Sequence, residues 1–128
     1  MQDGRGAALE ARPRVSPLLP ACAAATVAAD QATKAWALAR LEPGERVEVL
    51  GEILGFRLAR NPGGIFGILP GATAAFILLT ALIVVLVVVW AVKSREFPAL
   101  FGIVIGGGLG NLADRVTRGE GMLSGRVV

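Results

Sequence analysis

The chain has 128 residues, of which 54% are hydrophobic before glycine is counted, and a formal net charge of +3. Soluble domains reach about 45–50% apolar residues with glycine included, so the 17 glycines here make the composition typical of a small membrane protein. The absence of histidine excludes histidine-based catalysis and histidine-ligated metal sites. One cysteine permits neither an internal disulfide nor a cysteine-ligated metal. No basic block suggests a nucleic acid partner, and carboxylates, amides and backbone must carry any catalysis.

The first expected helix follows a polar tail. Residues 1–17 hold three arginines and two prolines, which predicts a cytoplasmic tail outside the membrane domain. An alanine-rich apolar segment follows at residues 18–38. Asp30 and Lys34 lie one helical turn apart in its outer third and so share one helix face. Taken alone, they are an ordinary i,i+4 pair.

A secretory signal peptide is a competing interpretation of this end, because a charged tail, an apolar stretch and small residues occur together. Leu19-Pro-Ala-Cys22 resembles the box before a lipid-modified cysteine, which would make the protein a secreted lipoprotein anchored through Cys22. However, only about five residues separate Pro17 from Cys22, too few for the apolar core of a signal peptide. The apolar run also continues beyond the cysteine, which favours an uncleaved first span.

The loop at residues 39–71 predicts a small sheet. Apolar and charged residues partly alternate in it, as in short strands, and Gly51 and Gly55 divide the pattern in two. The apolar members are Val47, Val49, Ile53, Phe56 and Leu58. We expect two strands forming an amphipathic sheet on the membrane surface. The loop ends in Asn61-Pro-Gly-Gly-Ile-Phe-Gly67, a turn-forming cluster.

Two further apolar segments complete the expected bundle. Residues 72–92 carry no charge and are long enough to cross a hydrocarbon core of about 30 Å as a helix. Lys93 and Arg95 follow, and the third segment, residues 99–113, is short for a span. The arginine-bearing tail and the Lys93/Arg95 turn both indicate a cytoplasmic N-terminus.

Glycines recur every fourth residue in the third segment, at Gly102, Gly106 and Gly110. Such a small-residue face lets another helix approach closely, although a flexible glycine-rich stretch is the simpler alternative. Because only three apolar segments are present, we expect part of this face to remain unpaired.

Polar clusters from different segments share the outer edge of this bundle. They are Asp30 with Lys34, Asn61 in the glycine turn, and Asn111 with Asp114-Arg115 at the end of the third segment. Ionisable groups within a membrane are candidate functional residues. Each cluster has a structural explanation by itself, but their common depth and side favour one shared site.

These residues resemble the lipoprotein signal peptidases (signal peptidase II). Asp30-x-x-x-Lys34, Asn61-x-Gly63-Gly-Ile-Phe66 and Gly110-Asn-Leu-Ala-Asp-Arg115 occur in that family's order and spacing. The resemblance implies an all-α integral membrane bundle, here with three of four transmembrane helices, and a small extracytoplasmic β-sheet. Residues 18–128 would form an incomplete peptidase domain in the bacterial cytoplasmic membrane, multi-pass, with the N-terminus inside.

The activity implied by the resemblance is that of an intramembrane aspartic endopeptidase without cofactor or metal. Its partners would be membrane lipids and a prolipoprotein bearing a diacylglyceryl group, from which it removes the signal peptide. Two close carboxylates cannot both ionise readily, so one would activate water while the protonated one polarises the scissile carbonyl.

The chain departs from the family at its end. The first dyad aspartate would directly follow Val128 and the second would lie further on, so no catalytic residue is expected within residues 1–128. By resemblance, Asn111, Asp114 and Arg115 would orient the dyad or line the substrate channel. Asn61 and Gly63 would place the surface loop, and Asp30 with Lys34 would brace the first helix. The rival interpretation is a non-catalytic membrane scaffold, or a degenerate homologue, that packs through its glycine face.

Overall fold

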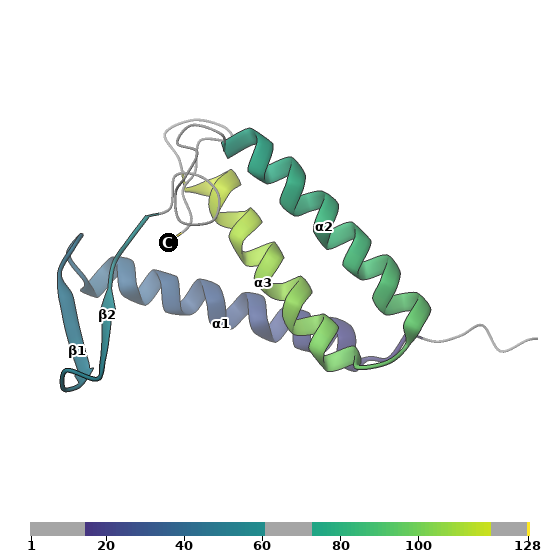
Figure 1. Ribbon diagram of the computed structural model, residues 1–128, viewed down its shortest axis with the longest axis horizontal. Helices are drawn as coiled ribbons and strands as arrows, with labels where there is room; N and C mark the ends of the chain where they lie inside the picture. Colours follow the sequence, from purple (N-terminus) through teal and green to yellow (C-terminus); the bar gives the residue numbers. More distant parts are fainter. Residues whose placement is uncertain (1–14, 61–72, 119–127) are drawn as a thin grey trace, which may run out of the picture.

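The computed structural model describes residues 15–60, 73–118 and 128. Within these residues lie three helices and a two-stranded hairpin: α1 (Leu18–Arg40), β1 (Arg46–Leu50), β2 (Leu54–Arg57), α2 (Thr73–Ser94) and α3 (Pro98–Thr117). Helix α3 packs against both α1 and α2, and the hairpin lies beyond the C-terminal end of α1 (Figure 1). The predicted helical bundle with a small sheet is therefore confirmed in outline.

Helices α2 and α3 are long and apolar enough to cross a membrane. In the most apolar 18-residue stretch of α2, only 6% of the residues are buried inside the chain. This helix is therefore not the core of a water-soluble domain. Its leucines, Val85, Val89 and Trp90 are exposed, as expected for side chains that face lipid. Helix α1 contains Asp30, Lys34 and Arg40 and is not one of these two candidate spans. The count of three spans stays a prediction.

The glycine face of α3 packs on α1. A β-carbon at Gly106 would lie 2.6 Å from the carbonyl oxygen of Ala23, and one at Gly102 would lie 2.5 Å from that of Leu19. At Gly110 an added β-carbon would collide with the carboxylate of Asp30. The backbones therefore approach as closely as glycine allows. The expectation that this face stays partly unpaired was wrong, because α1 covers all three glycines.

Helices α2 and α3 form an antiparallel pair joined by a tight turn. Arg95 and Phe97 adopt positive φ values of 56° and 49°, and Pro98 occupies the first turn of α3, where its missing N–H is not needed. Trp90 contacts Phe101 edge-on, with ring centroids 5.3 Å apart. The turn thus brings α3 back along α2, with their aromatic side chains in contact.

Helix α3 continues four residues beyond the predicted end of its segment, from Ala113 to Thr117. The apolar segment was expected to end near Ala113 with Asp114 and Arg115 at its edge, and the helix includes both residues. They lie within its last turns, where backbone hydrogen bonding continues to Arg118, whose N–H donates to the Asp114 carbonyl at 2.8 Å. Helical geometry thus directs these two adjacent side chains in different directions.

The predicted strands are confirmed, with a different role for one glycine. Strands β1 and β2 pair antiparallel, and Gly51 turns the chain between them with φ +54°. Gly55 does not divide the strands but lies within β2, opposite Glu48. Trp36 of α1 meets Phe56 of β2 edge-on, with ring centroids 6.2 Å apart, and this contact holds the base of the hairpin against α1.

Candidate functional site

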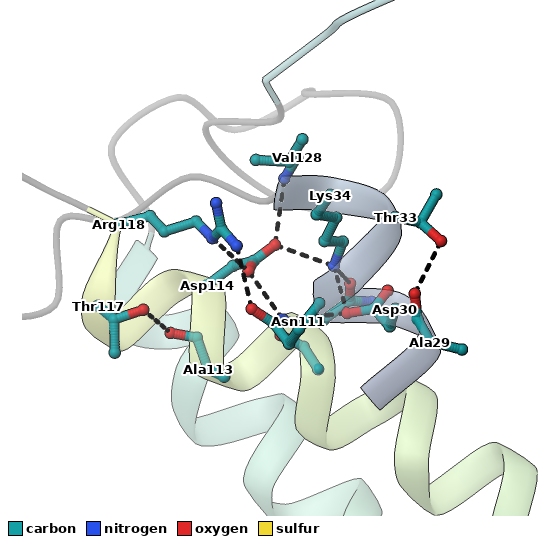
Figure 2. A network of polar contacts seen from close by, with 12 residues as sticks. Ala29, Asp30, Thr33, Lys34, Asn111, Ala113, Asp114, Thr117, Arg118 and Val128 are labelled. Carbon is teal, nitrogen blue, oxygen red and sulfur yellow. Dashed lines mark hydrogen bonds and ion pairs between the residues drawn. The ribbon is translucent and has the colours of Figure 1, made fainter. Parts of the chain in front are cut away.

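The candidate site is centred on the carboxylate of Asp114, which is fully buried. Its Oδ1 accepts from Arg118 Nε at 2.8 Å and from Gln31 Nε2 at 3.1 Å. Its Oδ2 lies 2.9 Å from Lys34 Nζ and accepts from the backbone N–H of Val128 at 3.2 Å (Figure 2). Four donors thus converge on one carboxylate: two from α1, Arg118 directly after α3, and the Val128 backbone. Each oxygen has two donors, about what a carboxylate oxygen can accept.

Lys34 joins the two helices through its ammonium group. Its Nζ lies 2.9 Å from Asp30 Oδ2 on α1 and 2.9 Å from Asp114 Oδ2 on α3. It also donates to Asn111 Oδ1 at 3.2 Å. The residue is buried, at 8% exposure, and an ammonium has three N–H donors. Three acceptors therefore match its full donor capacity, and Figure 2 shows the side chain pointing into this cluster.

Gln31 and Arg118 belong to the site although the sequence did not single them out. The Gln31 amide nitrogen lies within hydrogen-bond distance of Asp114 Oδ1, Asp30 Oδ2 and the Gly110 carbonyl, at 3.1, 3.1 and 3.2 Å. Its oxygen accepts from an Arg118 Nη2 at 3.0 Å. Arg118, Gln31 and Asp114 therefore form a closed ring of three interactions. The helical spacing of Asp114 and Arg118, four residues apart, was a usable signal.

Arg115 takes a separate direction. Its guanidinium carbon lies 5.4 Å from the ring centroid of Phe76 on α2, a cation–π geometry. The residue is 5% exposed, and its Nη1 is buried without a hydrogen-bond partner among the described residues. Asp114 and Arg115 are thus not an ion pair with each other. Asp114 connects α3 to α1, and Arg115 connects α3 to α2.

The structure brings together four of the seven predicted site residues: Asp30, Lys34, Asn111 and Asp114. Arg115 is the neighbour that diverges toward α2. Asn61 and Gly63 lie outside the described residues.

The cluster is arranged for binding and positioning rather than for proton transfer. Asp30 and Asp114 are separated by an ammonium that contacts both, so they do not share a proton as the two carboxyls of an aspartic dyad do. Asp114 is also already saturated with donors, which leaves no lone pair for a substrate water. Within the described residues, no group of three potential metal ligands occurs.

A cavity of about 240 Å³ lies beside the cluster, between α1 and the hairpin. Its lining includes Lys34 and Val128 together with the apolar side chains of Trp36, Phe56 and Leu58. A mostly apolar space of this size can hold part of a ligand.

The fold and the site define a helical membrane protein with an ionic cluster between its helices. Two solved structures of bacterial membrane enzymes are similar to it. One has a TM-score of 0.71 at 24% identity and covers 84% of this chain and 75% of that chain. The other has a TM-score of 0.66 at 29% identity and covers 75% of this chain and 64% of that chain.

The sequence profile of the family described as signal peptidase (SPase) II matches residues 22–128. The chain belongs to this family, as its motifs indicated.

Curated relatives support the same family. The lipoprotein signal peptidase of Bifidobacterium longum subsp. infantis is 41% identical over 108 residues, which is 83% of this chain and 59% of the relative. That of Rhodococcus jostii is 42% identical over 114 residues, which is 87% of this chain and 57% of the relative. The matched part of the chain thus spans somewhat less than three fifths of these relatives.

Proposed function

We propose that this chain forms the supporting part of an intramembrane aspartic endopeptidase that removes signal peptides from diacylglyceryl-modified prolipoproteins. In this proposal Asp114 is not a catalyst. The observation that carries it is the saturation of both Asp114 oxygens by donors, one of which is the Val128 N–H. A buried carboxylate bound in this way holds helices and backbone in place, and it cannot accept a proton from water without losing a partner.

The positioning role follows from where the Val128 N–H is held. The family resemblance places the first dyad aspartate directly after Val128, which remains a prediction. A hydrogen bond from Val128 to Asp114 would then fix the backbone next to that aspartate, relative to α1 through Lys34. Catalytic groups need such support, because small displacements from the reactive geometry are costly. The second dyad aspartate would come from a fourth helix.

The remaining predicted site residues receive roles within the same proposal. Asn111 and Asp30 orient the Lys34 ammonium, and Arg115 secures α3 against α2. Asn61 and Gly63 shape the loop around the substrate. The cavity beside Lys34 and Val128 offers space for the residues next to the scissile bond. Neither metal nor other cofactor takes part.

The proposed location is the bacterial cytoplasmic membrane, in a multi-pass arrangement with the N-terminus in the cytoplasm. Lys93 and Arg95 lie at the α2–α3 turn, and positive charge near span ends favours the cytoplasmic side. The ionic cluster lies at the opposite end of α3 and so would face the outer leaflet. A lipid-anchored substrate would reach it there from within the bilayer.

Two rival interpretations lose their main support. A scaffold that binds partners through its glycine face needs that face to be free, but α1 covers it. A lipoprotein anchored through Cys22 requires cleavage before that residue. Yet α1 runs without interruption from Leu18 to Arg40, and Cys22 packs where Gly102 approaches it.

The test is cleavage of a diacylglyceryl-modified prolipoprotein in detergent micelles. The purified 128-residue chain is expected to be inactive. The same chain joined after Val128 to the remaining C-terminal part of the Rhodococcus jostii relative is expected to cleave. In this fusion Asp114→Asn should reduce cleavage and Glu45→Gln, a hairpin-side control, should not. Cleavage by the 128-residue chain itself would show that Asp114 or another carboxylate within it is catalytic.

A further inference from the structure

A second cavity, here called the turn cavity, lies where the chain turns from α2 into α3. Its volume is about 170 Å³. Three helix ends supply its lining, with Ser16 and Leu19 at the start of α1, Val92 and Arg95 at the end of α2, and Pro98 at the start of α3. Figure 1 shows these helix ends gathered at the end of the molecule opposite the hairpin.

The packing of the three helices leaves this space open. Among the described residues, α1 and α2 each pack on α3 but not on each other. Helix α3 begins at Pro98, so the space between the ends of its two neighbours is not filled there. The lining combines apolar residues, such as Leu19 and Ala91, with the polar residues Ser16 and Arg95. An apolar cavity with a few polar groups is the usual form of a ligand site.

The two polar residues of the turn cavity have unused hydrogen-bond donors. A guanidinium has five N–H donors, yet within the described part of the chain Arg95 makes neither an ion pair nor a side-chain hydrogen bond, even with the neighbouring Glu96. The Ser16 hydroxyl accepts from the Leu18 N–H at 3.4 Å. This contact uses an oxygen lone pair and leaves the O–H without an acceptor among the same residues. Free donors, one of them charged, favour an anionic ligand.

We propose that the turn cavity binds the phosphate group of an anionic phospholipid. The Arg95 guanidinium matches two phosphate oxygens at once, and the Ser16 hydroxyl donates to a third. Basic pockets between transmembrane helices on the cytoplasmic side of a membrane bind anionic headgroups. The α2–α3 turn is the end of the bundle proposed above to face the cytoplasm. The inference rests on the membrane fold and not on peptidase activity.

A lipid fits the turn cavity better than a soluble anion does. Val15 and Val92 line it and are 46% and 42% exposed, so apolar surface continues from the cavity to the outside. Its volume of about 170 Å³ is below the roughly 300 Å³ at which typical ligand pockets begin, which suits a headgroup alone. The acyl chains would then lie along the exposed apolar surface of α2. Such a lipid would connect α1 to α2 at this end of the bundle.

Native mass spectrometry of the purified 128-residue chain in mild detergent tests the inference. The chain is titrated with dioctanoyl phosphatidylglycerol, and the fraction that carries one lipid gives an apparent Kd. Dioctanoyl phosphatidylcholine has the same chains without net charge, and inorganic phosphate supplies the anion without chains. Arg95→Gln and Ser16→Ala change the cavity. Lys93→Gln is the matched control, because it removes the same charge from a residue outside the lining.

We expect one phosphatidylglycerol per chain, with weaker binding of phosphatidylcholine. Arg95→Gln should raise the Kd about tenfold or more, because hydrogen bonds to a charged group are lost, and Ser16→Ala about threefold. Lys93→Gln should raise it less than about twofold, since its charge acts from a distance and is screened. Arg95 is exposed, and equal helical circular dichroism in all variants shows that folding is retained.

Three results would overturn the proposal. Equal losses in Arg95→Gln and Lys93→Gln would show diffuse attraction to positive charge without a site. Equal affinity for phosphatidylcholine would show that the acyl chains alone drive binding. Displacement of phosphatidylglycerol by inorganic phosphate at the same concentration would identify a site for a soluble anion instead of a lipid.

Discussion

Replacing Lys34 by methionine removes the ammonium that joins α1 to α3 and keeps a side chain of similar length. Lys34 Nζ contacts Asp30 Oδ2 and Asp114 Oδ2 at 2.9 Å each. Without it, two carboxylates face the same space, and Asp114 is fully buried. Arg118 and Gln31 still bind Asp114 Oδ1, but Oδ2 retains only the Val128 N–H.

The expected loss of stability is large for one residue. Removing one partner from a buried ion pair costs about 3–5 kcal/mol, because the other charge is left without compensation. The lower part of this range applies here, since Arg118 remains and Asp30 is partly exposed. The free energy of unfolding is measured by titrating dodecyl maltoside micelles with sodium dodecyl sulfate and following circular dichroism.

The control and a second substitution make the result decisive. Lys93→Met removes an ammonium at the end of α2 for which no ion pair is found among the described residues, and it should cost less than about 1 kcal/mol. Lys34→Met combined with Asp114→Asn should be more stable than Lys34→Met alone, because the uncompensated charge is gone. If Lys34→Met unfolds like Lys93→Met, the buried bridge does not stabilise the helix pair.

The remaining predictions use the same unfolding measurement. Gly106→Ala should cost about 1–3 kcal/mol through overpacking, because its β-carbon would lie 2.6 Å from Ala23 O and from Thr26 Cβ. Gly107→Ala, which meets nothing within 4 Å, should cost nothing, and equal losses would contradict the close α1–α3 contact. Arg118→Met should cost about 1.5–3 kcal/mol by removing a hydrogen bond to a charged group. Arg118→Lys should recover part of the stability lost in Arg118→Met. Equal stability of the two variants would argue against the ring with Gln31.

The sequence predicted the helices well because their signals are local. The uncharged run of α2 and the glycine repeat of α3 specify length and packing face without knowledge of the rest of the chain. The partner of the glycine face could not be predicted, because Gly106 fits equally well against any small-residue helix. The apolar segment was predicted to end near Ala113 whereas α3 continues to Thr117, because the contacts of Asp114 with α1 and of Arg115 with α2 could not be known from the sequence.

The site was predicted only in part, because some of its residues are visible in the sequence and others depend on how the helices pack. Asp30, Lys34 and Asn111 were recognisable as polar residues in apolar segments, and the resemblance placed them together. Gln31 was missed because an amide beside an aspartate in a helix carries no pattern of its own. Its role depends on α3 approaching within hydrogen-bond distance. The separation of Asp114 from Arg115 likewise depends on α1 and α2 lying on different sides of α3.

The charges of the cluster explain how it can lie between membrane helices. Asp30 and Asp114 are balanced by Lys34 and Arg118, so the four side chains enter the apolar environment as a neutral group. A single uncompensated charge there is far more costly. Arg115 is the one further cation on this part of α3, and it lies over the Phe76 ring instead of joining the cluster. Adding it to the cluster would have left an excess positive charge beside Lys34. Directing it to α2 keeps the cluster neutral and leaves Asp114 free to hold the Val128 backbone, which the proposed function requires of it.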